Sequence, residues 1–444
     1  MSGKGKRARK KEHGVAEITD LASNARGVGH VDGKAIFVAD TLPGEQVLFQ
    51  PTKVKKQYEE AAMATLFSAS SERVTPRCRH FGLCGGCALQ HASVEAQLGF
   101  KQSQLMNALS RVGHIEPERV LAPLVAERWG YRRRARLGVK YVPKKGGTLV
   151  GFRERGAPFI AELSRCEVLV PHVGERLLDL ARMIDRLSIR ERVPQIEVAA
   201  ADNATALVFR VLDAPTSEDL AILAAFGHEH DFQIHLQPGN EDAIAPIDAA
   251  AAALYYDLPA FDARLFFLPN DFVQIHAGIN RAMVSAALDA LNVAANDTVL
   301  ELFSGLGNFS VPLARKTARV VTVEGEAGLV ERARANATYN GCTNIEAHVD
   351  NLFEPADTPA WLPAHVDKVL IDPPRSGAAE VIDLIAARAP SRIVYCSCHP
   401  ATLARDGQRL VHEHGYHLTA AGVMDMFPHT AHIESMAVFE RKDN

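Results

Sequence analysis

The pattern of apolar and polar positions divides the chain into three parts. From about residue 14 to 67, short apolar runs such as 35–38 and 47–49 alternate with glycine turns, and this pattern predicts a series of short strands. From residue 264 to the end, strand-like apolar runs alternate with helical patterns, which predicts a mostly parallel sheet. Residues from about 128 to 265 mix strand-like and helical patterns, so we expect an α+β domain between the other two.

The first part predicts a small barrel. Several short strands separated by tight turns, such as Asp32-Gly33, are typical of the OB type of barrel. Barrels of this type often bind oligonucleotides. A structural β module without a ligand is the alternative.

The last part contains a candidate cofactor site. The strand at 298–302 ends in the loop ELFSGLGN at 301–308, whose glycines let the backbone pass close to a ligand. The next strand, at 319–323, is followed by Glu324, and a carboxylate at this position can accept hydrogen bonds from both hydroxyls of a ribose. A dinucleotide fingerprint requires a third glycine, but position 310 is serine, so NAD is disfavoured. S-adenosylmethionine has no pyrophosphate and needs no third glycine. A turn without a cofactor is the alternative.

Two further strands end in chemically informative residues. Cys398 lies just beyond the apolar run at 392–395, and Asp372 follows the run at 368–371. Because ligands bind at the carboxyl ends of strands in an open α/β sheet, both side chains are predicted at the binding edge. Cys398 is therefore a candidate nucleophile for covalent group transfer. The simpler alternatives are a buried structural thiol and a structural Pro-Pro turn after Asp372.

Composition and charge set the general class. The chain has 444 residues, 47% hydrophobic and 23% charged, which is typical of globular protein, and its length corresponds to roughly three domains. No segment approaches the roughly 20 unbroken apolar residues of a membrane helix, and the basic start MSGKGKRARKK lacks the apolar core of a secretory signal. We therefore expect a cytoplasmic protein that makes no membrane contact.

The positive charge is unevenly distributed. The net charge of −4 gives no overall sign of a nucleic-acid partner. Lysine and arginine gather at 1–11, 53–56 and 132–136, and the three runs together favour contact with phosphate. Taken singly, each run is better explained by a solvated face.

The cysteines favour a metal centre over disulfides. Of seven cysteines, Cys78, Cys84 and Cys87 form a C-x5-C-x2-C cluster, and Cys166 stands apart. Four thiolates can hold either a zinc ion or an iron–sulfur cluster. The spacing alone favours zinc, the commoner of the two.

Five late motifs together resemble the RNA uracil-5-methyltransferases, and the resemblance extends over nearly the whole chain. The motifs are FVQ at 272–274, FSGLGNF at 303–309, DPPRSG at 372–377, SCHPATL at 397–403 and FPHTAHIE at 427–434. Ser304 and His276 depart from residues common in the family, cysteine and asparagine, at positions without a catalytic role. The resemblance implies that Cys398 is the nucleophile and Glu434 the general base. It also implies S-adenosylmethionine contacts at Gln274, Phe303, Asn308, Glu324, Asn351 and Asp372.

The front of the chain refines the resemblance. Residues 27–45 resemble a TRAM domain, and Cys78, Cys84, Cys87 and Cys166 match the four ligands of a [4Fe-4S] cluster in the family, which reverses the preference for zinc. The presence of both features favours the type that methylates 23S ribosomal RNA at uridine 1939. The alternatives are another ribosomal or transfer RNA uridine, or a catalytically silent RNA-binding or assembly protein. We expect a monomer whose partner is 23S rRNA, with Arg132, Arg133 and Arg134 contacting the RNA.

The chemistry of the family accounts for these residue types. Carbon 5 of uracil is a poor nucleophile, and a thiolate adding at carbon 6 turns the ring into an enolate that can take a methyl group at carbon 5. A base must then remove the proton from carbon 5 before the thiolate leaves. A target base within folded RNA must also be turned out of its stack to reach the thiol.

The predicted fold class is α/β, with a Rossmann-like methyltransferase domain, an OB-like TRAM barrel before it, and an α+β central domain that carries the iron–sulfur cluster. The expected boundaries are a basic tail at 1–11, the barrel at 12–69, the central domain at 70–94 and 128–265, and the methyltransferase domain at 95–127 and 266–444.

Overall fold

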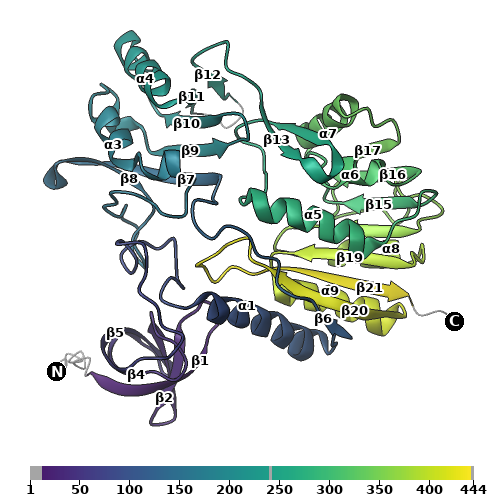
Figure 1. Cartoon of the computed structure of the whole chain (residues 1–444), viewed down its shortest axis with the longest axis horizontal. Coiled ribbons are helices and arrows are strands. Elements are labelled where there is room, and N and C mark those ends of the chain that lie inside the picture. Colours follow the sequence, from purple (N-terminus) through teal and green to yellow (C-terminus); the bar gives the residue numbers. More distant parts are fainter. Residues whose placement is uncertain (1–12, 240–242, 442–444) are drawn as a thin grey trace, which may run out of the picture. The chain divides into compact units, whose positions relative to one another are not determined.

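A computed structural model describes residues 13–239 and 243–441 (Figure 1). The chain forms two compact units: unit 1 runs to Phe100 and includes His429–Ala431, and unit 2 contains Lys101–Pro428 and continues from His432. The basic tail predicted at 1–11 lies outside the described residues.

Unit 1 begins with a closed barrel of five strands in the order β1-β2-β3-β5-β4. The strands are β1 (Gly14–Leu21), β2 (Gly27–Val31), β3 (Lys34–Ala39), β4 (Gln46–Val54) and β5 (Tyr58–Ser68). Ile18, Val38 and Val47 are fully buried inside the barrel. Asp32 and Gly33 both have positive φ, as the predicted tight turn between β2 and β3 requires. The small barrel predicted from the sequence is confirmed.

The cysteine segment follows the barrel within unit 1 and leads to α1 (Val94–Ala108). Arg73 ties this segment to the barrel, because its guanidinium lies 2.5 Å from the buried carboxylate of Glu45. Leu89 and Phe100 add an apolar contact by packing in one cluster with Leu42. The segment is thus anchored on both sides of its cysteines.

The first sheet of unit 2 has six strands in the order β12-β11-β10-β9-β7-β8. Its strands are β7 (Arg134–Val142), β8 (Gly147–Gly151), β9 (Gln195–Ala200), β10 (Thr205–Val211), β11 (Phe232–Pro238) and β12 (Ala245–Pro246). Its helices are α2 (Pro171–Gly174), α3 (Leu177–Asp185) and α4 (Ser217–His230). Only β10 and β11 run parallel in this sheet. This mixture of helices and mostly antiparallel strands is what the sequence predicted for the middle of the chain.

The second sheet of unit 2 has eight strands in the order β17-β16-β15-β18-β19-β21-β20-β6. They are β6 (Arg119–Val120), β15 (Thr298–Leu302), β16 (Arg319–Glu324), β17 (Ile345–Val349), β18 (Lys368–Ile371), β19 (Arg392–Ser397), β20 (Tyr416–Met424) and β21 (Glu434–Arg441). The five strands from β17 to β19 are parallel, and β21 runs against β19. The predicted mostly parallel sheet is confirmed. Because β6 pairs with β20, residues 119–120 belong to this sheet.

Helices cover both faces of the eight-stranded sheet (Figure 1). They are α5 (Ala277–Leu291), α6 (Ser310–Ala314), α7 (Ala327–Tyr339), α8 (Ala379–Ala386) and α9 (Pro400–Glu413), and a hairpin of β13 (Leu254–Leu258) and β14 (Ala263–Phe267) precedes α5. Along β15, Val299 packs in one apolar cluster with Met283 of α5, whereas Leu300 packs in a second cluster with Ile382 of α8. Side chains alternate between the faces of a strand, so the continuous apolar run of β15 follows from burial on both sides. None of the described helices has the length and apolar character needed to cross a bilayer.

Candidate active site

A cavity of about 480 Å³ in unit 2 brings the predicted site residues together. Its lining includes every predicted cofactor contact and both predicted catalytic residues: Gln274, Phe303, Asn308, Glu324, Asn351, Asp372, Cys398 and Glu434. These residues come from the ends of β15, β16, β17, β18 and β19 or the loops that follow them, from the start of β21 and from the segment before α5. The carboxyl ends of parallel strands meet at one edge of a sheet, which is why residues so distant in sequence converge.

The loop after β15 has the backbone that a close ligand requires. Phe303, Gly305 and Gly307 all have positive φ. A Cβ at Gly305 would meet no atom within 4 Å, so its glycine is required by the backbone conformation. The amide of Gly305 donates a 3.0 Å hydrogen bond to Glu324 Oε2, and the amide of Glu326 donates one of 3.0 Å to Oε1. Glu324 is thereby fixed at the end of β16, with lone pairs left to accept further bonds.

The buried acid Glu301 is hydrogen-bonded to the residue at which α6 begins, just after this loop. Glu301, inside β15, accepts a 2.5 Å hydrogen bond from the hydroxyl of Ser310. Burial raises the pKa of Glu301 to about 8, which favours the protonated form at neutral pH. Ser310 occupies the position of the missing third glycine, and its hydroxyl ties the start of α6 to β15.

Asn308 is held by two residues that the sequence did not single out. The Tyr256 hydroxyl donates to Asn308 Oδ1 at 2.9 Å, and Asn280 exchanges two amide hydrogen bonds with Asn308, at 2.9 and 3.0 Å. Two donors therefore occupy Oδ1, and one N–H of the Asn308 amide remains for a ligand. Tyr256 and Asn280 lie far from Asn308 in sequence, and no local pattern marks their contact.

Burial raises the pKa of two carboxyl groups in the cavity, those of Asp372 and Glu434. Burial raises the pKa of Asp372 to about 7. The pKa of Glu434 is raised to about 8, first by burial and then by the neighbouring charge of Asp372, against the opposing charges of Lys101 and Arg375. A carboxylate whose pKa lies near the working pH is suited to accept and release a proton.

Cys398 lies half-buried just beyond β19. Burial, followed by the charges of Glu434 and Asp372, raises its pKa to about 11, and Arg375 acts in the opposite direction. Arg375 lines the same cavity and is the cation that favours the thiolate. The DPPRSG motif was noted in the sequence, but this role of its arginine was missed.

A fully buried lysine underlies the segment that precedes Glu434. Lys101 donates to Asp425 Oδ1 at 2.6 Å and to the Phe427 carbonyl at 2.9 Å, and Arg128 also donates to Asp425. An uncompensated buried charge is very costly, so this paired cluster fixes residues 425–427. The positive charge of Lys101 also lowers the pKa of Glu434. No sequence signal distinguished Lys101 from the other lysines.

The arginine run that was predicted to contact RNA is largely committed within the protein. Arg133 is only 6% exposed, forms an ion pair with Asp202, and lies over the ring of Tyr256. Arg134 donates to the Pro269 carbonyl, and Arg132 donates to the Arg134 carbonyl at 3.0 Å. We therefore withdraw Arg133 as a residue that contacts RNA, because its guanidinium is buried and neutralised. The misleading signal was the run of like charges, which does not reveal burial.

The cysteine segment has the character of a thiolate site. Cys78, Cys84 and Cys87 are half-buried cysteines of unit 1, and the Gly86 amide lies 3.4 Å from the sulfur of Cys84 as a hydrogen-bond donor. Hydrogen bonds to sulfur are characteristic of iron–sulfur ligands. Cys166, also half-buried, lies in unit 2. The donor set therefore fits a thiolate-bound centre.

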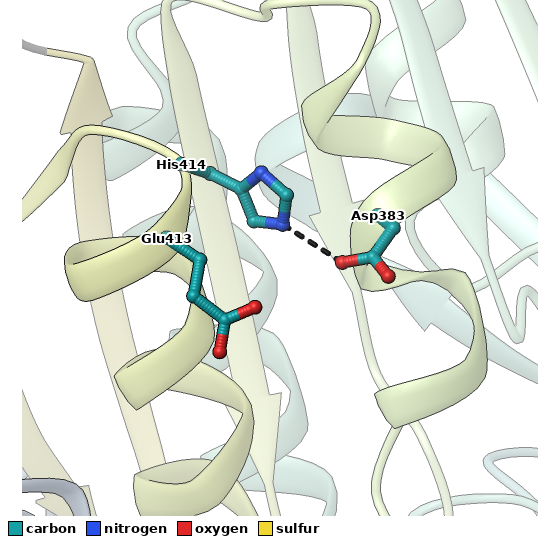
Figure 2. Close-up of side chains that lie close together, drawn as sticks. All are labelled: Asp383, Glu413 and His414. Carbon is teal, nitrogen blue, oxygen red and sulfur yellow. Dashed lines mark hydrogen bonds and ion pairs between the residues drawn. The ribbon is translucent and has the colours of Figure 1, made fainter.

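Among the described residues, one group of potential metal ligands has its donor atoms close together, and it lies on the surface of unit 2 (Figure 2). His414 contacts Asp383 at 2.8 Å, and Glu413 is its neighbour on the chain. Arg409 lies 2.5 Å from Asp383 and 3.8 Å from Glu413, so a guanidinium already neutralises both exposed carboxylates. This group is therefore explained as a surface ion-pair network.

Comparisons with known proteins agree with this architecture. The family model described as tRNA (uracil-5-)-methyltransferase matches residues 206–349 and 363–442, and the TRAM domain model matches 15–63. The 23S rRNA (uracil(1939)-C(5))-methyltransferase RlmD of Alkalilimnicola ehrlichii is 54% identical over 96% of both chains. The protein of the same name from Methylococcus capsulatus is 47% identical over 96% of this chain and 97% of its own. The structure of Pyrococcus abyssi tRNA (uracil-54, C5)-methyltransferase in complex with S-adenosyl-L-homocysteine has a TM-score of 0.73 at 23% identity, covering 96% of this chain and 99% of that one.

The fold of unit 2 is that of the S-adenosylmethionine-dependent methyltransferases, and the barrel of unit 1 belongs to a TRAM domain. The near full-length identity to the RlmD proteins is decisive for the family. The chain belongs to the RNA uracil-5-methyltransferase family, on its RlmD branch.

Proposed function

We propose that the protein transfers the methyl group of S-adenosylmethionine to carbon 5 of a uridine in 23S rRNA, the target being uridine 1939, which the names of its RlmD relatives specify. The observation that carries this proposal is the single cavity that contains the cofactor-binding residues, Cys398 and Glu434. The TRAM barrel supplies a domain suited to RNA.

The charge of the cavity suits a cationic methyl donor. Glu324, Asp372 and Glu434 line it against one cation, Arg375. A sulfonium brought among three carboxyl groups favours their ionised forms, so cofactor binding lowers the pKa of both Asp372 and Glu434. Glu324 at the end of β16 accepts hydrogen bonds from the ribose hydroxyls.

The reaction begins when the Cys398 thiolate adds to carbon 6 of the uracil. The electrons of the 5,6 double bond move into the ring carbonyl as an enolate, and carbon 5 becomes a nucleophile. Arg375 favours this step by stabilising the thiolate. Carbon 5 then attacks the sulfonium methyl, and the electron pair of the broken sulfur–methyl bond remains on the cofactor sulfur.

Methyl transfer itself prepares the final step. The cofactor becomes a neutral thioether, so a positive charge leaves the neighbourhood of Glu434 and the proton affinity of this carboxylate increases. Glu434 then removes the proton from carbon 5, the electrons of that bond re-form the double bond, and the thiolate of Cys398 leaves. The base is thus strongest at the moment when it must act.

An exposed aromatic ring is available to receive the displaced base. Phe272 lines the cavity and is 67% exposed, which is unusual for a phenylalanine. Turning a uridine out of its stack costs a few kcal/mol, roughly, and stacking on an aromatic face offsets part of this cost.

The direct test is to map methylated uridines in unmodified 23S rRNA after incubation with the protein and S-adenosylmethionine. We expect one 5-methyluridine, at position 1939, absent from reactions without cofactor. Transfer RNA is the matched alternative substrate, since the printed name of the Pyrococcus abyssi neighbour specifies uracil 54 of tRNA. Methylation of tRNA alone would contradict the ribosomal assignment. Tight RNA binding without methylation of either RNA would indicate the catalytically silent binding protein.

Cys78, Cys84, Cys87 and Cys166 are the proposed ligands of a [4Fe-4S] cluster. Its support is the family resemblance together with the half-buried position of all four cysteines, one of which accepts a backbone N–H at its sulfur. The cluster would have a structural role, with no part in the methyl transfer. A zinc ion held by the same four thiolates is the alternative.

Metal analysis separates these two centres. Protein purified without oxygen is expected to be brown and to contain about four irons and four sulfides per chain, as the cube of a four-cysteine site requires. We expect Cys84→Ser to lose iron and to unfold at a lower temperature, whereas Cys342→Ser, which changes a half-buried cysteine outside the proposed ligand set, keeps full iron content. Zinc without sulfide in the wild-type protein would overturn the cluster.

A further inference from the structure

A groove of about 740 Å³ lies on the six-stranded sheet of unit 2 and shares no lining residue with the active-site cavity. Its floor is formed by β7 and β8, including Arg136, Gly138 and Lys140 of β7. These three residues alternate along the strand and therefore face the same side of the sheet. The segment at 152–160, which follows β8, forms the wall.

The charge of this groove is predominantly positive. The cations that line it are Arg136, Lys140, Lys145 and Arg153, and the single acid is Glu154. Among the residues that the structure describes, Lys140 and Arg153 have no carboxylate within ion-pair distance. A polyanion would supply the missing negative charge.

The other two cations, Arg136 and Lys145, form only exposed ion pairs and can still bind a phosphate. Arg136 lies 2.9 Å from Glu197, but its side chain is 67% exposed. Lys145 lies 3.9 Å from Glu162, and both side chains are largely in water. Exposed ion pairs of this kind contribute little energy, so a phosphate can displace them at small cost.

An aromatic ring stands beside these charges. Phe159 is 66% exposed, a value matched among the described large apolar side chains only by Phe272 in the active-site cavity. Its segment is an ordered hairpin: the Glu154 amide donates to the Phe159 carbonyl at 2.8 Å, and the Ala161 amide donates to the Phe152 carbonyl at 2.8 Å. Regular backbone bonds therefore hold the phenyl ring out in water beside the four cations, where its face is available to a stacking partner.

We propose that this cationic groove binds a single-stranded segment of the RNA substrate outside the target site. Phosphates lie against Lys140 and Arg153, and one base stacks on Phe159, which is the combination that single-strand RNA sites use. RNA is favoured over a protein partner because a single exposed ring among four cations offers a polyanion more than it offers an apolar protein surface. The proposal rests on the proposed function for its choice of ligand.

The test measures binding of an RNA ladder that begins with a short hairpin around the target uridine and is extended by flanking single strand. We expect the wild type to bind more tightly once the flank reaches the groove. Phe159→Ala is expected to lose about fivefold to a hundredfold in affinity for the extended RNA only, the effect of removing one base–aromatic stack. Lys140→Gln with Arg153→Gln is expected to reduce the slope of log affinity against log salt by about 0.7 for each phosphate that the protein no longer neutralises. Phe159→Trp should retain affinity.

The matched controls are Leu178→Ala and Arg182→Gln, exposed positions on α3 outside the groove, which are expected to bind every RNA as the wild type does. Unchanged affinity and salt slope in the groove variants would overturn the proposal. So would normal affinity for protein-free RNA combined with loss of binding to ribosomal precursor particles, because that result assigns the groove to a protein. Since the readout is binding, a wild type that binds the ladder through the groove but methylates no uridine would contradict the proposed function alone.

Discussion

Cys398→Ala is expected to abolish methyl transfer, with a loss on the order of 10⁴-fold or more, because removal of a covalent nucleophile leaves only binding and positioning. The variant should still bind S-adenosylmethionine and RNA with affinities close to the wild type, since the thiol is one small group in a cavity of about 480 Å³. The measurement is single-turnover methylation of a 23S rRNA fragment together with equilibrium binding of both ligands.

Cys342→Ala is the matched control for this prediction. Cys342 is also a half-buried free thiol, and burial also raises its pKa, but it does not line the cavity. The Cys342→Ala variant should methylate the RNA at the wild-type rate. RNA that contains 5-fluorouridine provides the complementary readout, because fluorine cannot leave as a cation and the adduct should persist in the wild type and in Cys342→Ala but not in Cys398→Ala. A fully active Cys398→Ala variant would contradict covalent catalysis.

In the proposed mechanism, Arg375 helps the thiol of Cys398 to ionise. With the pKa of Cys398 raised to about 11 in the protein without ligands, only a small fraction of the thiol is ionised at neutral pH. The sulfonium of the cofactor and the guanidinium of Arg375 both oppose the charges of Asp372 and Glu434 that disfavour the thiolate. Cofactor binding and thiol activation are therefore linked through the same electrostatic field.

Local patterns in the sequence were sufficient for the elements that converge on the cavity. The apolar runs before Glu324, Asp372 and Cys398 predicted buried strands, and a parallel sheet gathers the residues at their ends without further information. The glycine turn after β15 could be predicted for the same reason, since positive φ in a tight loop favours glycine.

The contacts that hold the site rigid were not predictable in this way. Lys101 and Asp425 meet across 324 positions, and Tyr256 reaches Asn308 across 52. Their partners are set by the three-dimensional packing of α1 and of the β13–β14 hairpin, about which a local pattern carries no information. For Arg133 the sequence suggested a contact with RNA because its charge was visible. The burial of its side chain against Asp202 and Tyr256 was not visible in the sequence.

Glu434→Gln is expected to stop the reaction after methyl transfer, so that a methylated covalent complex between the protein and natural RNA accumulates. Glutamine keeps the size of the side chain but cannot take the proton from carbon 5, and loss of a general base costs about 10²- to 10⁴-fold. The adduct should resist denaturation, contain radioactivity from the labelled methyl group, and disappear in the double variant with Cys398→Ala. The matched control is Glu324→Gln, a second carboxyl group of the same cavity, which should weaken cofactor binding without accumulating an adduct.

The ionisation of Glu434 should make both the release of the adduct and the free energy of unfolding depend on pH. With the pKa of Glu434 raised to about 8, the base is mostly protonated at pH 6 and ionises as the pH rises, so release of the wild-type adduct should accelerate up to about pH 8 and then level off. In the unfolded state the pKa of Glu434 has its ordinary value of 4.5, so the folded state binds this proton more tightly than the unfolded state does. The free energy of unfolding should therefore fall as the pH rises from about 4.5 to about 8. Glu434→Gln should remove the pH dependence of adduct release. It should reduce the pH dependence of the free energy of unfolding without abolishing it, because burial also raises the pKa of Glu301 to about 8 and that of Asp372 to about 7. Rapid turnover by this variant, with no adduct at any pH, would assign proton removal to another group, and Asp372, whose pKa is about 7, would be the first candidate among the other carboxyl groups of the cavity.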